Sequence, residues 1–465
     1  MSKLSVLILA AVALGSLPAV HAHGATNGGG CFCVSCHLAR YGAGGAAVDP
    51  SQAEQAVSAP FRIGARWTST SATPNAPTQG TPVTLRWSIV PDGTAIPGGQ
   101  VAGESSDGSN LISYMDGIFG TGPGGSDLTQ RPWFTHYSSS FARWSALSGL
   151  SYIFEPNDDG SDLYTFVPGS GTFGGLGGQA GVRGDVRISG HAIDGPNGVL
   201  AYNFFPSIAD MVIDTSESSN FASSSNNFRF LRNVLMHEHG HGLGFAHLES
   251  SNSSQLMEPF INASFDGPQF DDILAVQRSY GDAREKGLGN DTAARATVLG
   301  SVSLGGPQLQ IGTSAGATSV VSSTQTDFVS IDDDSDIDFY RVTTLEQGGL
   351  TITLTPRGPT YNEGPQGGAQ SSFVSSALGN LTLAVVGPDL LTTLISVNLT
   401  GLGGIETITL PVLGGANYFV RVGGVSNQIQ MYLLQVSLVS GVIPEPGALV
   451  WVGVVGMGLV ARNRR

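Results

Sequence analysis

Apolar and polar positions follow two different periods in the first part of the chain. Apolar residues alternate with polar ones over 83–89, and a Pro-Asp-Gly turn follows, a pattern typical of a half-buried strand. Over 132–149 the apolar side chains recur every three or four residues, which predicts a helix with one apolar face. Two further helices are predicted, one from the polar cluster at 223–227 to about 244 and one over 270–280.

Short strands and loops connect these helices, and the pattern then changes. Strands are expected at 151–155, 186–189, 198–204 and 211–213, and the Gly-rich stretch 169–184 is expected to be a loop. After a charged, small-residued linker at 283–296, residues 297–438 show no helical period, only short β-branched runs between Gly-Gly turns. The fold class predicted is therefore α+β, with one domain at 65–282 followed by an all-β, antiparallel sandwich at 297–438.

Both ends of the chain have the composition of addressing segments. Residues 1–22 combine an early lysine, an apolar run and a small-x-small site, which predicts a secretory signal peptide, followed by a flexible, Cys-containing leader at 23–64. Residues 443–465 contain Pro-Glu-Pro, an apolar stretch and a basic tail. The apolar stretch 447–461 would reach about 22 Å as a helix against ~30 Å for a hydrocarbon core, so a permanent span would be strained. An ordinary membrane anchor with arginines on the inner side is the alternative.

Charge and cysteine content narrow the classes of function. Lys and Arg number 21 against 36 Asp and Glu, a formal charge of -15, and this argues against a nucleic-acid partner, whose phosphates require clustered cations. Cys31, Cys33 and Cys36 lie in one short segment, so no disulfide framework holds a core together. The segment 33–37 fits the C-x-x-C-H haem-attachment pattern, while a local disulfide or a zinc–thiolate contact are the alternatives.

A His-Glu-His-Gly-His run that begins at His237 carries the clearest chemistry. His237 and His241 are four residues apart, so on a helix both imidazoles project from one face and can share a metal. Gly244 can end the helix with a positive φ and turn the chain back, so that His247 becomes a third nitrogen ligand. Three imidazoles leave a tetrahedral zinc one open position for water, which predicts a catalytic site with Glu238 as general base.

The pattern His237-Glu238-x-x-His241-x-x-Gly244-x-x-His247 resembles the signature of the metzincin zinc peptidases. Leu256-Met257-Glu258-Pro259 resembles the methionine turn of that family, and the proline is similar to the matrixins, the matrix-metalloproteinase branch. The resemblance covers about 65–281. It implies a metzincin-type catalytic domain with a mixed twisted sheet and three helices, one catalytic Zn²⁺, and hydrolysis of protein or peptide substrates.

The same resemblance implies metal sites upstream. Asp210, Asp214 and Glu217 keep the spacing of a matrixin calcium loop, and Asp185 matches a second calcium-binding position, so structural Ca²⁺ is expected. Matrixins carry histidines for a second, structural zinc, but here Tyr202 and Val212 stand in their places. One zinc is therefore expected.

The resemblance also implies where a substrate binds. Gly198, Val199, Leu200 and Ala201 are expected to belong to the edge strand along which an extended peptide pairs through main-chain hydrogen bonds. The leader is too short for the helical pro-domain of the matrixins, and its cysteines do not match their cysteine-switch motif. Two roles for these cysteines remain as alternatives. A thiolate of the leader could bind the zinc and hold the enzyme latent, or two of the cysteines could form a local disulfide.

The last two segments resemble known modules of exported bacterial proteins. Residues 336–352 and 414–422 resemble the opening and the last hairpin of the pre-peptidase C-terminal β-sandwich of secreted bacterial proteases, which implies an accessory role. Residues 443–465 resemble the PEP-CTERM sorting signal of Gram-negative bacteria, which implies transient membrane capture and removal by a sorting protease. The resemblance implies an exported protein, extracellular or associated with the cell envelope.

The sequence thus predicts a monomeric, secreted or surface-attached zinc endopeptidase. Its rival is a non-enzymatic matrix or adhesion protein that keeps a zinc-binding core as a scaffold. The intact Glu238 argues against this rival, because a scaffold needs the three histidines but not the base. A haem-bearing electron carrier is the third hypothesis.

Overall fold

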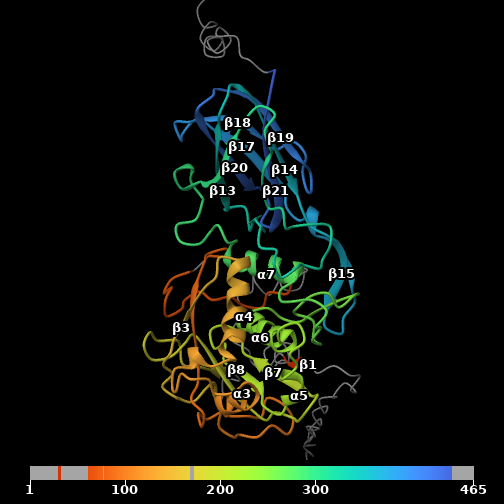
Figure 1. Cartoon of the computed structure of the whole chain (residues 1–465). Helices are drawn as coiled ribbons and strands as arrows, with labels where there is room; N and C mark the ends of the chain where they lie inside the picture. Colours follow the sequence, from red (N-terminus) through yellow and green to blue (C-terminus); the bar gives the residue numbers. More distant parts are fainter. Residues whose placement is uncertain (1–29, 33–60, 77, 168–171, 442–465) are drawn as a thin grey trace, which may run out of the picture.

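The computed structural model describes residues 30–32, 61–76, 78–167 and 172–441 (Figure 1). The predicted signal peptide at 1–22, the C-x-x-C-H segment and the sorting segment at 443–465 lie outside the described residues. Among the helices of the described residues, none combines the length and the apolar composition that a membrane crossing needs. Figure 1 shows a helix-containing body, coloured orange to green, joined to a body of strands coloured teal to blue.

A six-stranded sheet forms the centre of the first body. In order across the sheet it contains β1 (Gly30–Phe32), β7 (Val199–Asn203), β8 (Met211–Asp214), β6 (Val186–His191), β2 (Thr84–Ile89) and β3 (Ser151–Phe154). Neighbouring strands are parallel except β7 and β8, which are antiparallel, so the sheet is mixed. Every residue of β6 and β8 is buried, as expected of central strands covered on both faces.

Three helices occur where the sequence predicts them: α4 (Phe134–Leu147), α6 (Arg229–Gly242) and α7 (Phe270–Tyr280). The prediction of three helices in this domain was too low. The described residues also contain α3 (Leu111–Phe119) and the short α5 (Ser218–Phe221), besides the 3-10 turn η1 (Leu128–Gln130). Asn110 stands at the N-cap of α3, but its side chain makes no capping hydrogen bond. Instead the carboxylate of Asp92 accepts hydrogen bonds from the amides of Ile112 and Ser113, both at 2.9 Å.

The predicted Gly-rich loop contains a strand. β5 (Thr172–Gly174) pairs antiparallel with β4 (Thr165–Val167), and Phe166 stands opposite Phe173. Thr and Phe, the first two residues of β5, favour strands. The glycines around them make the stretch as a whole Gly-rich, and for that reason a loop was predicted.

The second body is rich in strands, as predicted, and consists of two sheets. One contains β10 (Thr297–Val302), β13 (Ile337–Thr344), β20 (Ala416–Gly424), β17 (Leu381–Val386) and β18 (Thr393–Val397). The other contains β11 (Leu309–Ile311), β21 (Gln430–Val439), β14 (Gly348–Pro356) and β19 (Glu406–Val412), with β12 (Ser330–Ile331) paired to β21.

Side chains from both sheets form one hydrophobic cluster between them; Tyr340 and Val342 come from β13, and Leu350 and Ile352 from β14. The pairing is not antiparallel throughout, because β10 runs parallel to β13. The chain between these two strands passes through β11 and β12 of the other sheet, and such a crossover permits a parallel return.

Contacts between the two bodies are extensive. After β14 the chain forms the hairpin of β15 (Thr360–Pro365) and β16 (Ser371–Val374), and β15 pairs antiparallel with β9 (Leu248–Ser250) of the first body. The larger hydrophobic core of the first body includes side chains from beyond residue 297, namely Ala315, Val321, Phe328, Tyr361, Phe373, Ile429 and Met431. The segment predicted as a linker contains the 3-10 turn η2 (Ala293–Arg295), and Asn290 donates from Nδ2 to Asp338 Oδ1 at 2.7 Å.

Candidate metal centre

Helix α6 presents two of the predicted ligands. His237 and His241 lie in its last two turns, where the residues from Val234 to Gly242 are all buried. The helix is held from two sides: Trp144 of α4 donates from Nε1 to the carbonyl of Met236 at 3.1 Å, and Asn203 of β7 donates from Nδ2 to the carbonyl of Glu238 at 2.5 Å. Both imidazoles therefore project from a rigid, desolvated helix face.

The chain reverses immediately after α6, as the sequence predicts. Gly244 has a φ of +104°, in the region that favours glycine, and the amide of Phe245 donates back to the carbonyl of Gly240 at 3.0 Å. A side chain at Gly244 has no room, because a Cβ there would lie 2.0 Å from the carbonyl oxygen of Ala65. This reversal brings His247 opposite the helix.

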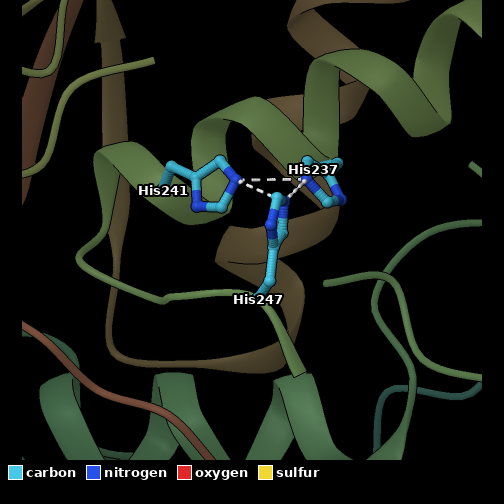
Figure 2. Close-up of side chains that lie close together, drawn as sticks. All are labelled: His237, His241 and His247. Carbon is cyan, nitrogen blue, oxygen red and sulfur yellow. Dashed lines mark hydrogen bonds between the residues drawn. The ribbon is translucent and has the colours of Figure 1, made fainter. Parts of the chain in front are cut away.

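The three histidines meet at their Nε2 atoms (Figure 2). The Nε2 of His237 lies 3.1 Å from that of His241 and 3.1 Å from that of His247, and the remaining pair is 3.2 Å apart. Four-coordinate zinc with Zn–N bonds of ~2.1 Å would separate its nitrogen ligands by about 3.4 Å. The observed spacing is close to that value.

The opposite ring nitrogens determine the tautomers. His237 Nδ1 faces the carbonyl of Leu256 at 2.7 Å, His241 Nδ1 faces the carbonyl of Phe245 at 2.6 Å, and His247 Nδ1 faces Gln366 Oε1 at 3.0 Å. Each partner is an acceptor, so each Nδ1 carries the hydrogen and donates it. Three Nε2 lone pairs then point at one another without a proton between them. Such an arrangement fits a cation at their centre, and the three residues are the ones that would hold it.

Burial keeps these imidazoles neutral, which metal binding requires. Burial and the neighbouring His247 lower the pKa of His237 to about 3, and burial lowers the pKa of His247 to about 4. The pKa of His241 lies well below its ordinary value for the same reason, assisted by the other two histidines. Proton competition for the ligand nitrogens is therefore weak at neutral pH.

Glu238 stands next to the first ligand and is fully buried. Successive helix positions differ by about 100° in direction, so its carboxylate leaves the helix beside the imidazole stripe rather than within it. The remaining histidine of the run, His239, is not part of the triad. Its Nε2 lies 2.7 Å from the hydroxyl of Tyr152 on the other side of the helix.

The predicted methionine turn lies beneath the triad. Met257 is buried, and its sulfur packs so closely against the helix that a Cβ on Gly240 would lie 2.4 Å from it. Asp272 of α7 fixes the turn, since its carboxylate accepts from the amides of Leu256 and Met257 at 2.8 and 3.1 Å. Sequence reasoning missed Asp272, although its capping box with Gln269 marks it as a residue at a helix start.

The predicted substrate strand forms, but its position differs from the prediction. β7 contains Val199, Leu200 and Ala201, and Gly198 precedes it. In the structure β7 is not the edge of the sheet, because Gly30 and Phe32 of β1 pair with it in parallel. An edge strand presents unpaired amides and carbonyls on one side, and the leader segment satisfies them.

Asp210, Asp214 and Glu217, the predicted calcium loop, do not bring their carboxylates together at one point. The carboxylate of Asp185 accepts from Ser71 and from the amide of Arg86, and that of Asp210 accepts from the amide of Tyr164. Asp214 and Glu217 are neighbours in the structure, and burial together with Asp214 raises the pKa of Glu217. Among the described residues, only the histidine triad brings three or more potential ligand atoms of His, Cys, Asp and Glu together.

The region of the second matrixin zinc holds a hydrogen-bonded network instead. His191 Nε2 lies 2.8 Å from Glu104 Oε1, and the hydroxyl of Tyr202 donates to the same oxygen at 2.7 Å. The hydroxyl of Tyr164 is 2.7 Å from that of Tyr202. His191 thus has protein partners on this side that do not require a metal.

Comparison with known proteins agrees with this geometry. Residues 179–281 match the matrixin family model. The matched segment contains Glu238 and the three histidines, and matrixins are zinc-dependent, so the match supports a metallopeptidase domain. Human matrix metalloproteinase-17 is 29% identical over 119 residues, which are 22% of this chain and 19% of that protein. Mouse matrix metalloproteinase-25 is 36% identical over 101 residues, 20% of this chain and 16% of the relative. The chain therefore spans about a fifth or less of these relatives.

Solved structures resemble about a third of this chain. The pre-peptidase C-terminal domain of a collagenase from Bacillus anthracis is 11% identical with a TM-score of 0.18, and the match covers 30% of this chain and 96% of that domain. A periplasmic inhibitor of g-type lysozyme from Aeromonas hydrophila is 14% identical with a TM-score of 0.16, over 31% of this chain and 98% of the inhibitor. At these scores the likeness carries no conclusion about function.

Proposed function

We propose that the chain is a zinc-dependent endopeptidase that hydrolyses peptide bonds of extracellular proteins. The observation that carries this proposal is the convergence of three Nε2 lone pairs from His237, His241 and His247, each fixed by an acceptor on its Nδ1. A zinc ion held there would supply Lewis acidity for the scissile carbonyl and lower the pKa of the attacking water.

The residues of the chain supply the remaining chemistry. Glu238 takes the proton of the attacking water and returns it to the leaving amine. Burial of the whole α6 face excludes bulk water around the reacting groups and strengthens electrostatic interactions there. A substrate peptide would pair with β7 on the side that β1 now occupies, so binding requires the leader strand to leave.

Glu238→Gln tests this function, because the change keeps the size of the side chain and removes only the proton acceptor. We expect the purified variant to retain zinc and its secondary structure and to lose about 10²–10⁴-fold in cleavage of casein or a quenched peptide, the usual contribution of general-base catalysis. Glu346→Gln, an exposed change of the same chemistry in the second body, serves as the control and keeps the activity of the parent.

The outcome separates the peptidase from the scaffold rival. A zinc-loaded Glu238→Gln protein that cleaves within about tenfold of the parent contradicts the proposed mechanism. A parent protein that binds zinc but cleaves no protein substrate favours a non-enzymatic scaffold.

A further inference from the structure

A hairpin from the second body reaches the metal centre. Strand β15 pairs with β9 in antiparallel register, and Pro365 stands opposite Leu248, the residue that follows the ligand His247. The pairing continues through Gly364 with Glu249 and Glu363 with Ser250. Through this pairing, a segment from more than a hundred residues further along the chain lies beside the strand that directly follows the third ligand.

The hairpin is anchored in the first body and is not a free loop. Tyr361 and Phe373 face each other across it with ring centroids 5.2 Å apart, and both side chains are buried in the larger core. The hydroxyl of Tyr361 donates to Asp271 Oδ1 of α7 at 2.7 Å, and the amide of Ser251 donates to the carbonyl of Asn362 at 3.2 Å. These contacts fix the position of the turn that follows β15.

Gln366 is the first residue of that turn, and its side chain ends on a ligand. Its Oε1 lies 3.0 Å from His247 Nδ1, in a partly buried position. The other two histidines use main-chain carbonyls of Leu256 and Phe245 for the same purpose, and those carbonyls belong to the first body. His247 is thus the one triad member whose acceptor is a side chain supplied by the second body.

The direction of this hydrogen bond has a chemical consequence. His247 needs its Nε2 lone pair for the metal, so its hydrogen must be on Nδ1, and an acceptor at Nδ1 favours that tautomer and fixes the ring plane. Without an acceptor, the hydrogen is free to move to Nε2 and the ring to rotate away from the other two nitrogens. Partners of this kind typically contribute 10–100-fold to metal affinity.

We propose that Gln366 is a positioning residue of the metal centre, and that the second body is therefore part of the zinc site and not an appended module. The inference rests on the proposed function in one respect, that the triad holds zinc; it does not require that the protein cleaves peptides.

The experiment compares Gln366→Leu, which removes the acceptor at similar size, with Gln366→Glu, which retains one. Gln370→Leu, an exposed change in the same turn, is the matched control.

In the full-length protein, zinc affinity is measured by competition with a chromogenic chelator, the visible spectrum is recorded with Co²⁺ in place of zinc, and the thermal midpoint of the metal-free protein is determined. We expect Gln366→Leu to lose about 10–100-fold in zinc affinity and to change the Co²⁺ spectrum, with an unchanged metal-free midpoint. Gln366→Glu and Gln370→Leu should bind zinc as the parent does, or more tightly.

Each other outcome is informative. Zinc affinity of Gln366→Leu equal to that of the parent overturns the proposal. Equal losses in Gln366→Leu and Gln366→Glu, accompanied by a lower metal-free midpoint, show a purely structural role and overturn it as well. If the expected pattern of affinities appears in a protein that cleaves no peptide, the positioning role stands and the proposed peptidase function fails. A parent without zinc affinity refutes both.

Discussion

Gly244→Ala probes the chain reversal that joins the second and third ligands. A Cβ at this position would lie 2.0 Å from the carbonyl oxygen of Ala65 and 2.6 Å from its carbonyl carbon, both of them main-chain atoms. Ala65 has little freedom to move, because its amide and that of Gly64 donate to the carbonyl of Gly244 at 3.3 and 2.8 Å. The substitution therefore strains the helix end or breaks the contact with the segment at 64–65.

The magnitude has two parts that a control can separate. A non-glycine residue at a φ of +104° costs about 1–3 kcal/mol. Displacing packed atoms to admit an extra carbon typically costs a further 1–3 kcal/mol or so. Gly93→Ala carries only the backbone cost of a positive φ, because Gly93 has a φ of +91° and no atom lies within 4 Å of its Cβ position. Gly244→Ala is thus expected to destabilise the protein by about 2–6 kcal/mol, and by about 1–3 kcal/mol more than Gly93→Ala.

Urea unfolding of the metal-free full-length protein measures both changes, and metal analysis of the same samples reports the ligand geometry. We expect Gly244→Ala to lose zinc as well as stability, because the residue lies between His241 and His247, whereas Gly93→Ala keeps its zinc. If the two variants unfold at the same urea concentration and both retain zinc, the steric reasoning about this turn is wrong.

Two further predictions concern buried carboxylates. Burial and the neighbouring Asp333 raise the pKa of Asp332 to about 8. Between pH ~4, where the carboxyl group of the unfolded chain loses its proton, and pH 8, the folded protein therefore keeps a proton that the unfolded chain has released. The contribution of this proton to stability is complete below pH ~4 and is lost as the pH rises toward 8. Thermal midpoints measured with a chelator present should fall less steeply between pH 5 and 8 in Asp332→Asn than in the parent, and parallel curves would contradict this assignment. Calcium added to protein stripped of it should raise the thermal midpoint through Asp214 and Glu217, whose carboxylates repel each other. An unchanged midpoint would remove calcium from the description of the protein.

Local chemistry explains which parts of the site could be predicted from the sequence. The spacing of His237, His241 and His247, with Gly244 between them, was readable because a helix and one reversal fix the geometry within eleven positions. Helix α3 was not predicted because its amides are capped by Asp92, a residue about twenty positions earlier. The pairing of β1 with β7 and the contact of Gln366 with His247 depend on tertiary register, and no local periodicity encodes either of them.

The core that crosses residue 297 bears on how the protein folds and matures. Phe328, Ile429 and Met431 belong to the same hydrophobic cluster as the residues around α4 and α7. Neither half can expose its share of this cluster without uncovering apolar surface of the other, so the two halves should melt together in a single cooperative transition. A protease that cut the segment at 283–296 would leave two fragments still held by that surface. The strand-rich half could then be released only if the hydrophobic cluster that it shares with the metal-bearing half were disrupted.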